Sequence, residues 1–144
     1  MPDSNRRVML IDDDMGDTLL LKKLLLKHNN HLEIDVEQDP ENALSKLEAL
    51  AEHTPYKLPD VILLDINMPR MTGFELKEKL SQSPQLSKLP VIFLTTSAAP
   101  SDIDNAYKLG GNAYLTKPGD LGGMRQIVEA FVNFWLRSAQ LPSH

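Results

Sequence analysis

Short apolar runs alternate with segments of helical periodicity along this chain, and that alternation limits its fold more than any other feature. DVILLD at 60–65 is a continuous apolar run, typical of a strand that is buried on both faces of a sheet. DTLLLKKLLLKH at 17–28 instead repeats its apolar residues with the spacing of a helix. The same pattern predicts strands at 8–12, 33–38, 60–65, 91–95 and 113–116, and helices over about 17–28, 40–52, 73–82, 101–109 and 120–138. Five strands that alternate with five helices predict an α/β fold with an open parallel sheet.

Composition narrows the classes of protein that fit this pattern. A chain of 144 residues, 42% hydrophobic and 24% charged, fits a single domain over 1–144 with its core at about 7–138. No long apolar run or signal-like N-terminus is present, so we expect a cytoplasmic protein without membrane contact. The absence of Cys excludes disulfides and thiolate catalysis, and a net charge of −5 argues against nucleic-acid binding. The histidines fall in polar segments and are expected at the surface: His28, His31, His53 and His144.

Polar residues stand where the predicted strands end. Asp12 and Asp13 close the strand at 8–12, and Asp65 closes 60–65. Thr95 ends the strand at 91–95, and Lys117 stands at the end of the strand at 113–116. In a flavodoxin-like sheet of order 2-1-3-4-5, the first and third strands are neighbours that flank the switch point. We therefore expect the three carboxylates to converge there, with the threonine and the lysine approaching from the far side.

The acidic triplet at 12–14 admits two interpretations. The first is a solvated turn that caps the next helix, which needs no ligand. The second is a cation site, because three like charges at the end of a buried strand repel one another. Oxygen ligands without His or Cys suit Mg²⁺, so we expect Asp12 and Asp13 to hold this metal and Asp14 to be the least committed of the three.

Four segments resemble the receiver domains of two-component response regulators, over residues 7 to about 130. They are IDD at 11–13, LLDINMPRMTG at 63–73, PVIFLTTS at 90–97 and LGGNAYLTKP at 109–118. Each segment alone is weak evidence for this family, whereas the four segments in this order and spacing are highly specific for it. The resemblance implies these roles: phosphoacceptor, Asp65; Mg²⁺ ligands, Asp12, Asp13, Asp65 and the Asn67 carbonyl; contacts to the phosphoryl oxygens, Thr95 and Lys117; rotating switch aromatic, Tyr114.

The residue types fit this chemistry independently of the resemblance. An ionised Asp65 is a nucleophile that can take a phosphoryl group and form an acyl phosphate. Charge in the loose transition state sits on peripheral oxygens, so Mg²⁺ and Lys117 would act by neutralising it. Thr95 can then move onto the phosphate and Tyr114 can fill the vacated space. We expect a phosphoacceptor signalling protein and not an enzyme. Such a protein catalyses only its own phosphoryl transfer and autodephosphorylation.

The partners are implied by a narrower resemblance. The segments at 51–59 and 81–90 and the ending FWLRSAQLP resemble small stand-alone regulators that pair with phytochrome-type bacterial histidine kinases. This resemblance implies a sensor histidine kinase or a phosphotransfer protein as the partner, with light as one candidate input. Because the sequence ends soon after the last predicted helix, we expect no output domain.

Three other functions are weighed against this one. A haloacid-dehalogenase-like phosphatase also uses an Asp nucleophile with Mg²⁺, but it usually needs a second Asp where this chain has Asn67. A flavodoxin-like cofactor binder needs a Ser/Thr-rich phosphate loop after the first strand, where this chain has acids. A pseudo-receiver that only docks would lack the acidic pair or Lys117, and only chemistry can exclude it.

The last predicted helix carries more apolar side chains than packing on one sheet requires. At 100° steps they spread over roughly 200°, which is wider than a core-facing stripe, and they are Leu121, Met124, Ile127, Val128, Phe131, Val132, Phe134, Trp135 and Leu136. We expect a homodimer through this helix, with Val132 and Leu136 on the leftover face. The alternative is that the AQLP tail at 139–142 folds back and covers that face.

Overall fold

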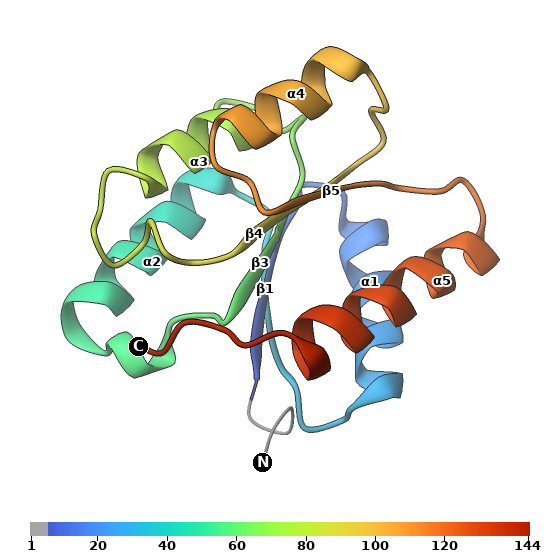
Figure 1. Ribbon diagram of the computed structural model, residues 1–144, viewed down its shortest axis with the longest axis horizontal. Helices are drawn as coiled ribbons and strands as arrows, with labels where there is room; N and C mark the ends of the chain where they lie inside the picture. Colours follow the sequence, from blue (N-terminus) through green and yellow to red (C-terminus); the bar gives the residue numbers. More distant parts are fainter. Residues whose placement is uncertain (1–5) are drawn as a thin grey trace.

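The computed structural model describes residues 6–144, which form one five-stranded sheet and its covering helices (Figure 1). The strands are Arg7–Ile11 (β1), Glu33–Glu37 (β2), Val61–Leu64 (β3), Val91–Thr95 (β4) and Ala113–Thr116 (β5). The α-helices are Met15–His28 (α1), Pro40–His53 (α2), Gly73–Leu80 (α3), Pro100–Lys108 (α4) and Leu121–Phe131 (α5). A short 3₁₀-helix, Pro55–Lys57 (η2), follows α2, and a π-helix, Val132–Ser138 (η3), continues α5. Within this part of the chain no helix combines the length and the apolar character that a membrane span requires.

The sheet is parallel throughout and has the order β2-β1-β3-β4-β5. This confirms the predicted flavodoxin-like fold. The chain winds outward in one direction from β1 to β2 and in the other from β1 through β3 to β5, so the switch point lies between β1 and β3. Ile11 pairs with Leu64, which makes the two strands end side by side. The polar residues that follow them are therefore neighbours.

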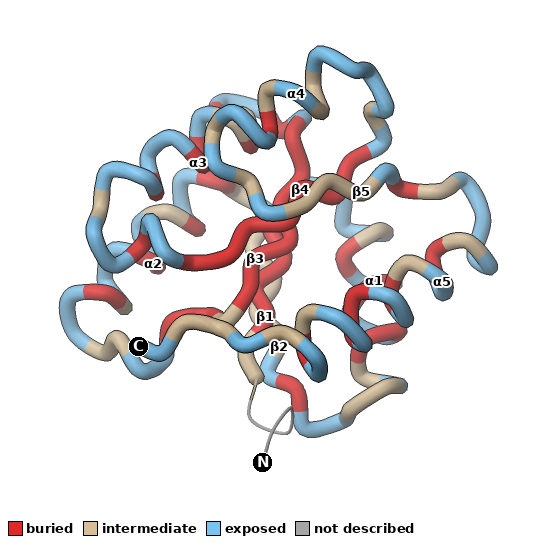
Figure 2. Tube along the Cα trace, in the orientation of Figure 1, coloured by how far each residue is buried: buried red, intermediate tan, exposed pale blue. Residues whose placement is uncertain are grey.

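Helices cover both faces of the sheet. α1 and α5 lie on one face, and α2, α3 and α4 lie on the other (Figure 1). Each layer has its own apolar core, and the central strands β1, β3 and β4 are buried over most of their length (Figure 2). All four residues of β3 are buried. This explains why its sequence is a continuous apolar run instead of an alternating one.

The ends of the elements differ from the predicted ones by a few residues. β1 stops at Ile11 and β3 at Leu64, so Asp12 and Asp65 lie just beyond the ladder. α1 begins before residue 17 because Asp14 is its N-cap, and the Asp14 side chain accepts a hydrogen bond from the Asp17 N–H. The capping interpretation of the acidic triplet thus holds for Asp14. Asp39 caps α2 in the same way.

The end of the last helix corrects one prediction. The regular α-helix stops at Phe131, and the π-helical segment has a wider turn than the 100° step assumes. That wider turn brings Val132 and Leu136 into the core beside α1, where each is only 1% exposed. Their predicted place on a free face is wrong. The exposed apolar side chain of this segment is Phe134, at 56%.

The C-terminal tail bears on the alternative in which AQLP at 139–142 covers the last helix. Residues after η3 leave α5 and run along the amino ends of the strands (Figure 1). Lys88 Nζ donates a hydrogen bond of 2.8 Å to the Ser143 carbonyl, and His144 Nε2 lies 3.1 Å from the Pro59 carbonyl. Because Phe134 is 56% exposed, the tail does not cover this side chain. His144 is exposed at the end of the chain, as expected, although its imidazole packs inward and its side chain is only 7% exposed.

Candidate functional site

Three carboxylates meet at the carboxyl ends of β1 and β3. Asp12, Asp13 and Asp65 each place one carboxylate oxygen within 4.8 Å of the other two. Asp12 and Asp65 are buried, whereas Asp13 is exposed and gives the cluster access to solvent. Asp65 Oδ1 accepts a hydrogen bond of 2.8 Å from the N–H of Ile66, which fixes the orientation of this carboxylate. The predicted convergence of the acids is confirmed.

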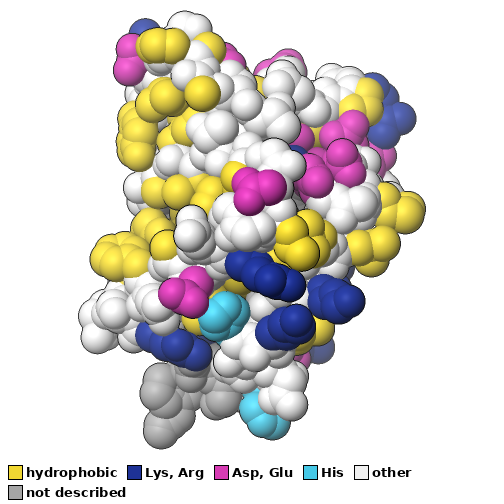
Figure 3. Space-filling model, turned by 90° about the vertical axis from the view of Figure 1, so that its right-hand side faces the viewer, with side chains coloured by type: hydrophobic (Ala, Val, Ile, Leu, Met, Phe, Trp, Pro, Cys, Tyr) yellow, Lys and Arg dark blue, Asp and Glu magenta, His cyan; other side chains and the backbone are white. Residues whose placement is uncertain are grey.

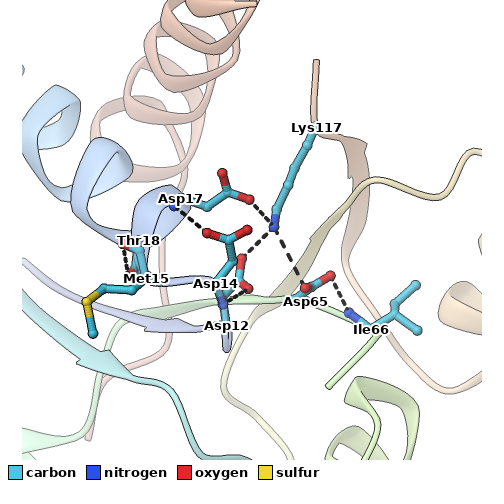
Figure 4. A network of polar contacts seen from close by, with 8 residues as sticks. All are labelled: Asp12, Asp14, Met15, Asp17, Thr18, Asp65, Ile66 and Lys117. Atoms are coloured by element: carbon cyan, nitrogen blue, oxygen red, sulfur yellow. Dashed lines mark hydrogen bonds and ion pairs between the residues drawn. The ribbon is translucent and has the colours of Figure 1, made fainter. Parts of the chain in front are cut away.

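Lys117 closes the site from β5. Its Nζ lies 2.5 Å from Asp12 Oδ2, 2.8 Å from Asp17 Oδ2 and 3.7 Å from Asp65 Oδ2 (Figure 4). Burial alone would lower the pKa of this lysine, but hydrogen bonds to Asp12 and Asp17 outweigh burial and raise it. The ammonium group is therefore a fixed positive charge beside Asp65.

Negative charge exceeds positive charge in this pocket. Burial raises the pKa of Asp12 to about 6, and the neighbouring Asp65 carboxylate adds to the rise. The hydrogen bonds from Lys117 Nζ and from the Asp14 N–H act in the opposite direction and offset the rise only in part. A divalent cation would supply the missing positive charge, and clustered carboxylate oxygens are the hard ligands that Mg²⁺ and Mn²⁺ accept. The donor set thus fits a divalent metal.

Thr95 stands at the end of β4 with an unused hydroxyl group. The residue is 0% exposed, and among residues 6–144 its Oγ1 has no hydrogen-bond partner. Leaving a buried hydroxyl unpaired costs about 1–3 kcal/mol, so most such groups in folded proteins have a partner. The Thr95 hydroxyl is therefore available to an acceptor that arrives in the pocket.

Tyr114 contacts the loop that follows Thr95. Its hydroxyl donates a hydrogen bond of 2.8 Å to the Ser97 carbonyl, and its ring centroid lies 6.4 Å from that of Phe93. Burial raises the pKa of this hydroxyl, which keeps it protonated as a donor. Ser97 Oγ in turn donates to Asp102 in the first turn of α4, at 2.6 Å. The loop after Thr95 is thus tied to both β5 and α4.

The loop after β3 explains the NMPRMTG segment. A Cβ at Gly73 would lie 2.1 Å from the Asp65 carbonyl oxygen, so only glycine allows this approach. The Gly73 N–H donates to the Ile66 carbonyl at 2.8 Å and closes the turn around the phosphoacceptor candidate. Asn67 is exposed in this loop. Its role as a carbonyl ligand stays a prediction.

Asp17 is the site residue that sequence reasoning missed. It stands in the first turn of α1, and its contact with Lys117 joins residues 100 positions apart. Its spacing from Asp14 could have identified it in the sequence. A carboxylate three residues after a capping Asp lies on the first turn of the helix, close to the end of the strand before that helix.

Comparisons with known proteins agree with this geometry. Residues 8–129 match the model of the response regulator receiver domain family. Response regulator Rcp1 of Synechocystis sp. is 32% identical over 136 residues, which are 94% of this chain and 92% of Rcp1. The crystal structure of a phosphorylated cyanobacterial phytochrome response regulator, RcpA, superimposes with a TM-score of 0.89 at 33% identity, covering 96% of this chain and 99% of RcpA. The Mn²⁺-bound form of Rcp1 gives a TM-score of 0.86 at 31% identity, covering 96% of this chain and 99% of Rcp1.

Proposed function

Because the chain belongs to the family of response regulator receiver domains, we propose that it is a stand-alone signalling protein whose Asp65 accepts a phosphoryl group from a histidine kinase. The observation that carries the proposal is the meeting of Asp12, Asp13 and Asp65 with the Lys117 ammonium in one pocket. Rcp1 and this chain cover each other over nearly their full lengths, which supports the stand-alone form.

The two oxygens of Asp65 have different environments. Oδ1 is held by the Ile66 N–H, whereas Oδ2 faces Lys117. We assign Oδ2 as the nucleophile: it forms a bond to phosphorus while the bond from phosphorus to the donor nitrogen or oxygen breaks, and the electron pair leaves with the donor. Lys117 stabilises the charge on the peripheral oxygens of the phosphoryl group. A bound Mg²⁺, held by Asp12, Asp13, Asp65 and the Asn67 carbonyl, would neutralise further charge there.

Metal binding gives a direct prediction. Mg²⁺ at 100 times its dissociation constant should raise the free energy of unfolding by about 2.7 kcal/mol, because it binds only the folded chain. Thermal melts with and without Mg²⁺ measure this effect. Asp13→Asn should remove most of it, whereas Asp104→Asn, which changes an exposed acid on α4, should keep it. Equal Mg²⁺ stabilisation in the Asp13 and Asp104 variants would contradict the metal site.

The unpaired Thr95 hydroxyl suggests how phosphorylation is sensed. A phosphoryl oxygen would offer it an acceptor, and movement of Thr95 would pull on the loop that Ser97 ties to Tyr114 and Asp102. The signal would then reach the surface formed by α4, β5 and α5. Tyr114 is partly buried and already donates a hydrogen bond to the Ser97 carbonyl, so we propose that phosphorylation stabilises this arrangement.

Thr95→Val separates phosphorylation from switching. Valine has nearly the same shape and lacks the unpaired hydroxyl, so the free energy of unfolding should stay the same or rise by about 1 kcal/mol. Urea denaturation measures this change. The variant should still accept phosphate on Asp65 while losing the response of its α4–β5–α5 surface, which hydrogen exchange reports. A loss of stability above about 1 kcal/mol would show that Thr95 Oγ1 has a partner in the unphosphorylated protein.

The kinase partner is proposed from the relatives. RcpA is described as a cyanobacterial phytochrome response regulator, and a further similar structure is described as a response regulator in red light signaling of R. palustris. This chain shares 33% and 29% of its residues with them over almost its full length. We therefore propose a phytochrome-type histidine kinase as the phosphoryl donor.

The second proposed partner is another copy of this chain. An apolar groove lies between β5, the edge strand of the sheet, and the outer side of the last helix; its lining includes Leu115, Ile127, Phe134 and Trp135. Hydrophobic side chains lie close together on the left half of the face in Figure 3. Apolar patches of this kind mark interfaces. A two-fold dimer through α5 and β5 would place the switch surface at the interface, so that phosphorylation changes the affinity between subunits.

A further inference from the structure

We propose that Asp17 is a positioning residue, which holds the Lys117 ammonium when a divalent cation takes Asp12. The inference rests on the proposed function, because it concerns the same metal and phosphoryl site. It starts from the contacts of one ammonium group, which lies 2.5 Å from Asp12 Oδ2 and 2.8 Å from Asp17 Oδ2. These two carboxylates hold it from different elements, the end of β1 and the first turn of α1 (Figure 4).

Asp12 has no oxygen without a partner. Its Oδ1 accepts a hydrogen bond of 2.9 Å from the Asp14 N–H, and its Oδ2 is held by Lys117. A divalent cation that binds Asp12 must therefore share an oxygen with a donor. The Asp14 N–H belongs to the backbone at the start of α1, whereas the lysine side chain can move and its ammonium is repelled by the cation. Lys117 is the partner that yields.

Asp17 is suited to receive the displaced ammonium. It does not belong to the three-carboxylate cluster of Asp12, Asp13 and Asp65, so a metal there leaves it free to pair with Lys117. Its backbone is fixed by the capping hydrogen bond of 3.0 Å to Asp14 Oδ1, and its side chain is only 31% exposed. An ammonium held by Asp17 stays near Asp65, where the phosphoryl oxygens will need it.

The contact between Asp17 and Lys117 should affect the metal affinity of the site. Without Asp17, Asp12 is the only carboxylate left within hydrogen-bond distance of Lys117 Nζ among the described residues. Lys117 then competes more strongly with the cation for Asp12. Asp17→Asn should therefore weaken Mg²⁺ binding through Lys117, by about fivefold if the coupling is near 1 kcal/mol. A purely long-range loss of negative charge would weaken binding without involving Lys117.

The test is a double-mutant cycle on the full chain, with Mg²⁺ affinity measured by calorimetry and Mn²⁺ affinity by electron paramagnetic resonance. Asp17→Asn should weaken both by about fivefold, and Asp17→Glu should restore part of the loss. In the Lys117→Met background, Asp17→Asn should change the affinity by less than about twofold. Asp14→Asn is the matched control, because it removes an equal charge from the same turn and Asn still caps α1.

The outcomes separate this inference from the proposed function. If Asp17→Asn weakens binding no more than Asp14→Asn does, the positioning role is wrong. An unchanged loss in the Lys117→Met background also overturns it, since the effect is then electrostatic. If the wild-type chain binds neither cation, the metal site of the proposed function itself fails, whatever the variants do. Thermal melts without metal check that each variant is folded.

Discussion

Asp65→Asn is expected to abolish phosphorylation of the chain by acetyl phosphate and Mg²⁺. The amide of asparagine is not a nucleophile towards phosphorus, although its oxygen can keep the hydrogen bond from the Ile66 N–H. The fold around residue 65 should therefore survive the change. On a phosphate-affinity gel the wild-type chain should shift and the variant should run as a single unshifted band.

The matched control is Asp104→Asn, which replaces an exposed carboxylate on α4. It should leave the shift intact, because Asp104 does not belong to the acidic cluster. A shifted band in the Asp65 variant would mean that another carboxylate accepts the phosphoryl group. Asp12 and Asp13 would then be the first candidates, since they share the pocket.

Val132→Glu should unfold the protein or destabilise it by about 4 kcal/mol or more, because it places an unpaired carboxylate in the core. Val132 is 1% exposed and belongs to the core cluster beneath α1 and α5. Phe134→Glu, two residues away, should leave the fold intact, since that ring is largely exposed. Urea denaturation followed by tryptophan fluorescence measures both effects.

The same pair tests the proposed dimer. Light scattering should show a dimer for the wild-type chain with an aspartyl-phosphate mimic, and a folded monomer for Phe134→Glu. Arg137→Glu serves as a control for charge, because it also adds a carboxylate to an exposed position of this helical segment. A wild-type chain that stays monomeric at high concentration, with and without the mimic, would contradict the dimer. A Val132→Glu variant as stable as Phe134→Glu would contradict the packing of the π-helical segment.

The sheet and its acidic edge could be predicted from sequence because each rests on a local pattern. A buried parallel strand such as β3 needs a continuous apolar run, and the side chain that follows it falls at the edge of the sheet. Once the strand order is known, the Ile11–Leu64 pairing brings Asp12 beside Asp65. The glycine that ends the NMPRMTG segment has a structural reason, because only glycine at position 73 permits the turn under Asp65.

Other features could not be predicted because they depend on distant contacts. Nothing in VNFWLRS marks a change from α- to π-helical winding: the segment has no Pro or Gly, and tertiary packing decides where Val132 and Leu136 point. The tail follows Pro59 and Lys88, which are far from it in sequence. Asp17 meets Lys117 across 100 positions, so its role emerges only when α1 and β5 are placed side by side.

The alternative functions differ in what they require of this pocket. A docking pseudo-receiver needs neither the acids nor the lysine, so it offers no reason for Asp12, Asp65 and Lys117 to meet in a buried site with an excess of negative charge. Burying such a group of charges costs desolvation free energy, which a docking function gives no reason to spend. The phosphoacceptor function accounts for all three side chains and for the unpaired Thr95 hydroxyl.

Chemical mapping of the acyl phosphate can show directly whether Asp65 carries the phosphoryl group. Borohydride reduces an aspartyl phosphate to homoserine, so the phosphorylated chain can be reduced, digested and sequenced by mass spectrometry. We expect homoserine at position 65 alone, in an amount that depends on Mg²⁺ and falls sharply in Lys117→Met. Homoserine at position 12 or 13, or its absence from the whole chain after treatment with acetyl phosphate and Mg²⁺, would contradict this assignment.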